Sequence, residues 1–157
     1  MRFICSLITV ENVGKSRLLY EKILNQKVRA DYGENVAFEG GFALHNKGHF
    51  RELIDGKEIT SGSNNFELYF EDDDILELQR ILTKSGFEFL HEAREQPWRQ
   101  LVIRFYDYDR NIVEVGERME HVAYRLYLEN KNTEIIAAIT YMTPAQVEAA
   151  VREYAPT

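Results

Sequence analysis

Glu114 is the residue whose surroundings most directly suggest chemistry. It follows Ile112 and Val113 and precedes Val115 in a short apolar run. Burying an unpaired carboxylate is unfavourable, so such a group is usually paired or neutralised. Three interpretations are open. Glu114 faces water from an edge strand, a cation of the chain holds it, or it reaches into a cavity as a metal ligand or general base.

The segment before Glu114 is typical of two strands joined by a tight turn. Residues 101, 103 and 105 are apolar and alternate with Val102, Arg104 and Tyr106, which predicts a strand with two unlike faces. The turn formers Asp107-Tyr108-Asp109-Arg110-Asn111 then reverse the chain. A second strand is expected over 112–115, with Glu114 at its middle.

Composition limits the class of protein. The chain has 157 residues, 45% hydrophobic and 12% aromatic, which predicts one globular protein with a real core. A net charge of −7 disfavours nucleic acid and anionic membranes as partners and favours a cationic ligand. The single cysteine excludes an internal disulfide. Because no membrane span or leader segment is evident, we predict a cytoplasmic location.

The order of predicted elements repeats. Strand 2–9, helix 13–24 and strands 27–32, 35–39 and 42–46 are followed by a polar loop over 47–64 that is partly helical near 50–54. Strand 65–71, a helix ending at Gly86 and strands 87–91, 100–106 and 112–115 then give the same order again. This duplication predicts an α+β fold made of two strand-helix-strand-strand-strand modules.

The Asp107–Asn111 turn and the strand with Glu114 resemble the closing strands of the vicinal oxygen chelate superfamily, which includes glyoxalase I, bleomycin and fosfomycin resistance proteins and extradiol dioxygenases. The usual wording there is Asp-Pro-Asp-Gly-Asn, so this chain lacks the Pro and the Gly. The segments ITVENVGKSRLLYEKIL, residues 66–72 and residues 97–117 are also similar to that family. Within the superfamily, the closing segment looks closest to small bacterial glyoxalase-like proteins.

The resemblance covers residues 1–117. It implies two βαβββ modules, about 1–50 and 64–117, that form a cleft-bearing curled mixed sheet, with 118–157 as a helical C-terminal extension. Metal-dependent members use four strand positions, which fall here on Cys5, Ala43, Asn65 and Glu114, with His45 two residues after Ala43 and facing the same side. Because only Glu114 is of the expected type, we predict no cofactor; the alternative is a divalent metal held by Glu114, Cys5 and His45.

Arg104 offers a reason for a missing metal. By the family pattern its side chain faces the cleft, where it would pair with Glu67 and Glu114 and satisfy both without an ion. Tyr69, Trp98, Tyr106 and Phe38 would add an aromatic wall suited to a planar or cationic ligand. The expected ligand-binding set is Cys5, His45, Asn65, Glu67, Tyr69, Trp98, Arg104 and Tyr106, and Glu114 is the expected proton shuttle if the protein is an enzyme.

Simpler interpretations stand beside these. Cys5 is also typical of a small buried core residue, and His45 of an exposed strand end. As sequence features alone, such aromatic residues are more typical of a core than of a ligand-binding wall. His49, His91 and His121 have no recognisable partners in the sequence and are interpreted as surface residues.

The tail is predicted to be helical over 119–129 and 133–140, with a third helix opened by Thr143-Pro144. The last two helices look like a helix-turn-helix, but Arg152 is the only basic residue of the second, which disfavours DNA binding. The apolar tail residues predict packing against the sheet or a second copy, and therefore a homodimer. They are Ile135, Ile136, Ile139, Val147 and Val151.

The sequence thus predicts a protein that binds and sequesters a small organic molecule without a metal. The alternative is a metal-dependent lyase, isomerase or dioxygenase that uses Glu114 with Cys5 and His45. A regulator that acts through the C-terminal helices is a more remote alternative.

Overall fold

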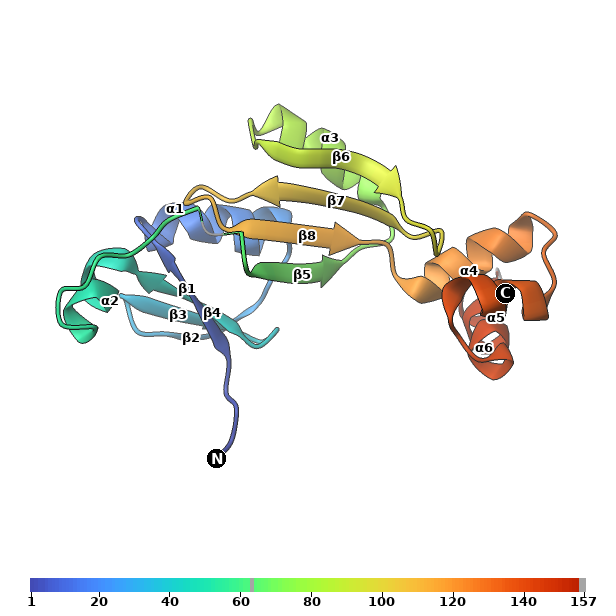
Figure 1. Cartoon of the computed structure of the whole chain (residues 1–157), viewed down its shortest axis with the longest axis horizontal. Coiled ribbons are helices and arrows are strands. Elements are labelled where there is room, and N and C mark those ends of the chain that lie inside the picture. Colours follow the sequence, from blue (N-terminus) through green and yellow to red (C-terminus); the bar gives the residue numbers. More distant parts are fainter. Residues whose placement is uncertain (63, 156–157) are drawn as a thin grey trace. The chain divides into compact units, whose positions relative to one another are not determined.

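The computed structural model describes residues 1–62 and 64–155. It confirms an α+β fold with two four-stranded sheets, each with a βαβββ arrangement, followed by C-terminal helices (Figure 1). The elements are β1 (Ser6–Val10), α1 (Val13–Arg17), η1 (Leu18–Ile23), β2 (Val28–Asp31), β3 (Asn35–Phe38), β4 (Phe42–Asn46), α2 (Lys47–Leu53), β5 (Glu67–Glu71), α3 (Ile75–Lys84), β6 (Phe89–Glu95), β7 (Leu101–Tyr106), β8 (Ile112–Gly116), α4 (Met119–Leu128), α5 (Thr133–Thr140) and α6 (Pro144–Tyr154).

The chain forms two compact units, which we describe separately. The first unit comprises Met1–Glu67, Ile81–Glu88 and Tyr106–Ile112. The second unit comprises Leu68–Arg80, Phe89–Phe105 and Val113–Thr157.

The sheet of the first unit has the strand order β1-β4-β3-β2. β1 runs parallel to β4, whereas β3 is antiparallel to both of its neighbours. Its core contains Phe38 and Phe42, whose rings stack 4.6 Å apart, with Tyr20 beside them. Phe38 is fully buried in this core, so its expected place in a ligand-binding wall was wrong.

The helix after β1 begins where the sequence predicts. The side chain of Asn12 accepts a hydrogen bond from the backbone N–H of Lys15 at 2.8 Å and so caps α1. The following η1 is a π-helix, and the N–H of Leu24 donates to the carbonyl of Leu19. Tyr20 in this wide turn is fully buried, and its hydroxyl donates to Asp107 at 3.0 Å.

The loop between β7 and β8 is tied together by Asp107. Its carboxylate, in a side chain only 5% exposed, accepts hydrogen bonds from the backbone N–H groups of Asp109 and Asn111 and from the Asn111 side chain. Arg110 has φ 64°, in the left-handed region that favours glycine. This conformation explains why the related turns carry Gly at the position that Arg110 occupies here.

The second sheet has the order β5-β8-β7-β6, and β6 is antiparallel to β7. Ile103 and Phe105 of β7 are fully buried, whereas Arg104 between them is half-buried, as the predicted alternation requires. Val102, on the same face as Arg104, is buried as well, so the two faces differ less than predicted. Ile75 and Leu78 of α3 are also buried, and α3 lies along this sheet in Figure 1. β6 is longer than predicted and extends to Glu95.

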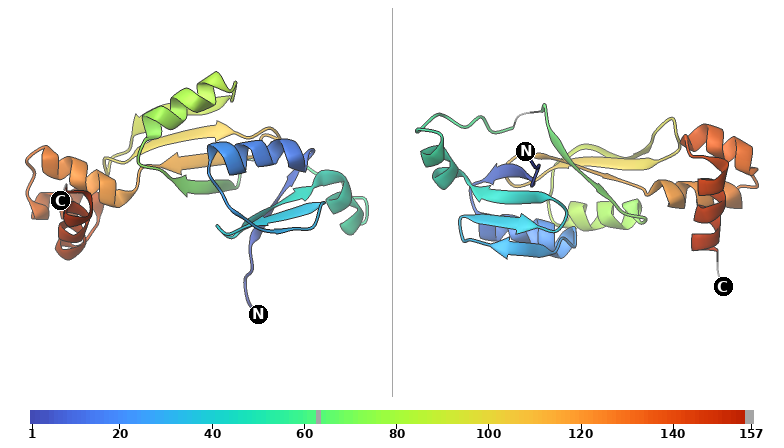
Figure 2. Two further views of the ribbon diagram at one scale, coloured as in Figure 1. Left: turned by 180° about the vertical axis from the view of Figure 1, so that it is seen from behind. Right: turned by 90° about the horizontal axis from the view of Figure 1, so that it is seen from below.

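The three C-terminal helices pack on one another, as both views of Figure 2 show. Their core consists of Val122, Ala123, Leu126, Ile136, Val147 and Ala150. Two of the apolar residues assigned from the sequence to a sheet or a second copy, Ile136 and Val147, therefore serve this helical core instead. Pairing with a second copy stays a prediction.

None of the helices in 1–62 and 64–155 is long and apolar enough to cross a membrane. The cytoplasmic location stays a prediction.

Candidate functional site

Arg104 joins three neighbouring strands of the second sheet. Its guanidinium donates to the carboxylate of Glu114 on β8. Glu114 is only 8% exposed. Nη1 of the same guanidinium lies 3.3 Å from Nε2 of His91 on β6, its register partner. Of the three interpretations of Glu114 that the sequence left open, the structure shows the one in which a cation of the chain holds the carboxylate.

His91 faces Arg104 as a neutral acceptor. Its Nδ1 lies 2.9 Å from the carbonyl oxygen of Glu92, which can only accept, so Nδ1 carries the proton. Nε2 then presents its lone pair to the guanidinium. Arg104 is thereby fixed between a carboxylate on one side and an imidazole on the other. His91, interpreted from the sequence as a surface residue, is part of this polar row.

Tyr69 on β5 is held by a second set of hydrogen bonds. Its hydroxyl donates to Glu71 and accepts from the side-chain N–H of Gln100, both at 3.0 Å. Gln100 in turn accepts from the indole N–H of Trp98 at 2.8 Å. Burial, with smaller contributions from the hydrogen bond to Glu71 and from the negative charges of Glu71 and Glu114, raises the pKa of Tyr69 to about 12. The phenol therefore stays protonated at neutral pH, as a donor.

Gly116 permits this arrangement. A Cβ added at Gly116 would lie 2.7 Å from the side-chain nitrogen of Gln100 and 3.1 Å from the hydroxyl of Tyr69. Any larger residue would push Gln100 out of contact with Tyr69. Gln100 was not singled out from the sequence, because a glutamine at the start of a strand has no distinctive signal.

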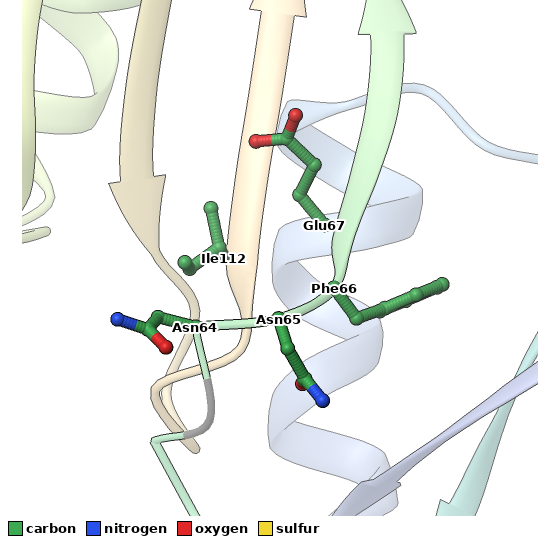
Figure 3. A pocket seen from close by; sticks show the side chains of 5 residues that line it. All are labelled: Asn64, Asn65, Phe66, Glu67 and Ile112. Atoms are coloured by element: carbon green, nitrogen blue, oxygen red, sulfur yellow. The ribbon is translucent and has the colours of Figure 1, made fainter.

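A hollow of about 310 Å³ lies at the start of β5 in the first unit. It is lined by Asn64, Asn65, Phe66, Glu67 and Ile112, whose side chains Figure 3 shows. Asn65 and Glu67, both expected from the sequence to bind a ligand, contribute an amide and a carboxylate to it. Because side chains alternate along a strand, Glu67 and Tyr69 lie on the same face of β5.

The remaining predicted residues belong to the first unit. His45 is only 7% exposed, so its interpretation as an exposed strand end was wrong; Nε2 of His45 lies 3.0 Å from Nδ1 of His49, which corrects the view of His49 as isolated. Cys5 is half-buried ahead of β1 and is not a core residue. The ring of Tyr106 is covered by the guanidinium of Arg110 at 4.1 Å.

His121 also has a partner. Its Nδ1 lies 2.9 Å from the carboxylate of Glu117, which is in turn held by Arg125. The contacts of the histidines depend on strand register and on helical spacing. These contacts cannot be recognised when each histidine is considered without its neighbours in the fold.

The donor chemistry at Glu114 does not fit a metal ion. The carboxylate is already bound by a guanidinium, whose positive charge opposes a second cation at the same place. Within the described ranges, no three residues of the His, Cys, Asp and Glu types are grouped to hold an ion. A site made of Glu114, Cys5 and His45 stays a prediction.

The fold and the turn with Glu114 define a class, and comparison with known proteins agrees. The family model described as "Glyoxalase-like domain" matches residues 3–120, so the chain belongs to this family and to the vicinal oxygen chelate superfamily that the sequence resembles. Among curated proteins, none matches the chain.

Solved structures of several bacterial proteins are similar to the chain. A protein of unknown function from Agrobacterium tumefaciens is 34% identical, with a TM-score of 0.66 over 74% of this chain and 94% of that one. A glyoxalase/bleomycin resistance protein/dioxygenase family enzyme from Burkholderia phytofirmans is 12% identical, with a TM-score of 0.64 over 74% and 98%. A hypothetical protein from S. aureus is 16% identical, with a TM-score of 0.64 over 74% and 94%. The last two show the fold alone.

Proposed function

We propose that this protein binds a small organic molecule on the polar face of its second sheet, without a metal ion at Glu114. The observation that carries the proposal is the Arg104–Glu114 pair, held in place by His91. Such a row of charged groups in a sheet is costly to desolvate, so a structural role alone explains it poorly. A fixed guanidinium and carboxylate can instead orient a ligand that both accepts and donates hydrogen bonds.

The ligand class follows from the groups on that face. The ion pair is neutral overall, Tyr69 supplies an aromatic ring, and 28% of the Arg104 side chain is accessible to solvent. A flat aromatic or heteroaromatic molecule would stack on the ring while its polar edge meets the pair. The net charge of −7 favours a cationic member of this class over an anionic one. Sequestration of such a compound, as in a resistance protein, is the function we infer.

Fluorescence of Trp98 offers a direct test. It is the single tryptophan, and Gln100 links it to Tyr69, so a ligand bound at Tyr69 should alter its emission. We expect saturable quenching by members of a panel of cationic and neutral aromatic compounds. Arg104→Met should weaken the binding by about 10-fold or more, the effect of one lost charge-assisted hydrogen bond.

Arg94→Met is the matched control, because Arg94 is exposed on β6 and stands outside the polar row. Equal affinity of the Arg104 and Arg94 variants would contradict the proposal. A metal that co-purifies at one ion per chain and is lost in Glu114→Gln would replace it with the enzymatic alternative.

A further inference from the structure

We propose that His91 couples ligand binding on the polar face of the second sheet to pH. The neutral imidazole holds Arg104 in its binding position, and a second proton on that imidazole displaces Arg104 and releases the ligand. The inference rests on the proposed function, because it concerns the same site, and it adds a positioning residue and a form of regulation to that site. His91 acts through Arg104 and does not have to touch the ligand.

His91, Arg104 and Glu114 stand opposite one another on the neighbouring strands β6, β7 and β8 (Figure 1). His91 and Arg104 are register partners. The N–H of Glu117 donates to the carbonyl of Leu101 in the hairpin of β7 and β8, and this register places Arg104 opposite Glu114. Side chains that are directly opposite on one face are nearest neighbours, so a change at His91 acts first on Arg104.

The two nitrogens of His91 have different partners. Nδ1 lies 2.9 Å from the carbonyl oxygen of Glu92, so it keeps its proton whether the ring is neutral or charged. Nε2 lies 3.3 Å from Nη1 of Arg104 and accepts a hydrogen bond through its lone pair. A second proton can therefore bind only at Nε2. This proton converts the acceptor of the ring into a donor, so that one N–H then faces another.

Protonation also brings two positive charges together at this contact. A guanidinium does not lose its proton in proteins, so the repulsion is relieved only by movement. The new N–H of His91 needs an acceptor, and the carboxylate of this row, Glu114, is already bound by Arg104. Because Glu114 is almost fully buried and Arg104 is partly open to solvent, we expect the guanidinium to move outward. Its N–H groups then leave the position in which they would meet a ligand.

The remaining charged side chains of β6 and α3 are exposed or have partners of their own. They are Glu92, Arg94 and Glu95 of β6 and Glu77, Arg80 and Lys84 of α3. The carboxylate of Glu92 lies 3.5 Å from the side-chain nitrogen of Gln79, Glu95 pairs with Arg99 at 2.8 Å, and Glu77 pairs with Arg80. Arg94 and Lys84 are exposed, so water screens their charges. The direct contact with Arg104 therefore decides how a proton on His91 affects the site.

The coupling has a definite sign. Ligand and proton compete, so the affinity for the ligand is full where His91 is neutral and falls with decreasing pH once His91 carries the second proton. Imidazole is the side chain that ordinarily changes its charge between pH 5 and pH 8. Because one proton is exchanged for one ligand, the dissociation constant should rise by up to about 10-fold per pH unit on the acidic side.

NMR of the whole chain tests the proposal without any ligand. The side-chain Nε–H signal of Arg104, assigned by its absence in Arg104→Met, should be protected from exchange at pH 8. It should shift and lose protection with the same midpoint as the ring signals of His91. In His91→Gln, whose amide does not titrate, the Arg104 signal should stay the same from pH 8 to pH 5. His121→Gln removes another histidine of the second unit and should leave the change at Arg104 in place.

An Arg104 signal that ignores the charge of His91, or that changes equally in His91→Gln, would overturn the proposal. If His91→Gln fails to fold, the shared midpoint of the His91 and Arg104 signals in the unaltered protein decides the question. Loss of the shared midpoint would then count against the coupling.

A second measurement repeats the Trp98 titration with ethidium, an aromatic cation whose own charge is constant from pH 5 to pH 8. Its dissociation constant should be at least about 10-fold higher at pH 5 than at pH 8 in the unaltered protein, and nearly equal at the two pH values in His91→Gln. Quenching that depends on Arg104 but not on pH would leave the proposed function standing and refute the coupling. Absence of quenching at both pH values would count against the proposed function for this cation, and the NMR titration would still decide whether His91 controls Arg104.

Discussion

Glu114 and Arg104 form a hydrogen-bonded ion pair between neighbouring strands, in which the carboxylate is almost fully buried and the guanidinium is partly open to solvent. The two partners therefore differ in their access to solvent. Loss of Arg104 leaves a charge with little access to water, whereas loss of the Glu114 charge leaves a guanidinium that water can still reach.

This asymmetry predicts the outcome of a double-mutant cycle. Arg104→Met should lower the free energy of unfolding by about 2–3 kcal/mol, and Glu114→Gln by about 1–2 kcal/mol. The double variant should lose less than the sum, with a coupling of about 1–2 kcal/mol. Urea unfolding measures all three, and Arg94→Met should stay within about 0.5 kcal/mol of the unaltered protein. Additive losses would show that the pair has no energetic coupling.

Gly116 should not accept a methyl group. Gly116→Ala places a carbon 2.7 Å from the Gln100 side chain, and we expect a loss of about 1–3 kcal/mol through overpacking. The double variant Gly116→Ala/Gln100→Ala removes the side chain that the new methyl group would meet, so it should recover part of that loss. Gly14→Ala, inside α1 with its nearest neighbour at 3.4 Å, is the control and should be neutral or stabilising. A Gly116→Ala protein as stable as the parent would mean that the close approach is not tight.

The order of elements and much of the polar row were predictable from sequence because they depend on local chemistry. Period-2 alternation defined the two faces of β7, and Asn12 and Thr143 marked helix starts that the structure confirms. The pairing of Arg104 with Glu114 was expected from the resemblance to the family, and the turn between the two strands brings the two residues together. In each case the information lies within about 15 residues, where spacing determines which side chains share a face.

The features that were not predicted depend on neighbouring elements of the fold or on local backbone conformation. Burial of His45 follows from α2 beginning at Lys47, earlier than the polar composition of that loop suggests. The role of His91 depends on the register of β6 against β7, which shifts at an irregularity near His91. The π-helical turn at Leu18–Ile23 has no signature in an ordinary amphipathic pattern.

The start of α6 offers a test of the helical extension. The hydroxyl oxygen of Thr143 accepts the N–H of Gln146 at 3.3 Å, and the Gln146 side chain accepts the N–H of Thr143 at 2.8 Å. Thr143→Ala removes one half of this capping box and should cost about 1 kcal/mol. Thr133→Ala is the matched control, because Asn132 caps α5 there. Hydrogen exchange of α6 amides should report the loss; equal exchange in the two variants would contradict it.

Asp73 should make the stability of the second unit depend on pH in the acidic range. Arg118 donates two hydrogen bonds to its carboxylate, at 2.9 and 2.7 Å, and the Tyr154 hydroxyl of α6 donates a third at 2.8 Å. The hydrogen bonds from Arg118, more than those from Tyr154, lower the pKa of Asp73 below its ordinary 3.8. A lowered folded-state pKa means that the stabilisation is complete above the ordinary value and is lost as the pH falls through the lowered one.

The melting temperature measured against pH tests this directly. Asp73→Asn should be less stable than the unaltered protein by about 1 kcal/mol at pH 7, a modest figure because the ion pair is partly exposed. The gap should begin to narrow below pH 3.8 and should close as the pH falls through the lowered pKa of Asp73, where the folded protein also becomes protonated. Asp55→Asn serves as the control, since Asp55 is exposed and its positive φ suits Asn. A gap for Asp73→Asn that stays constant from pH 7 to pH 3 would show that Arg118 does not hold the ionised carboxylate, and that α6 is anchored by packing alone.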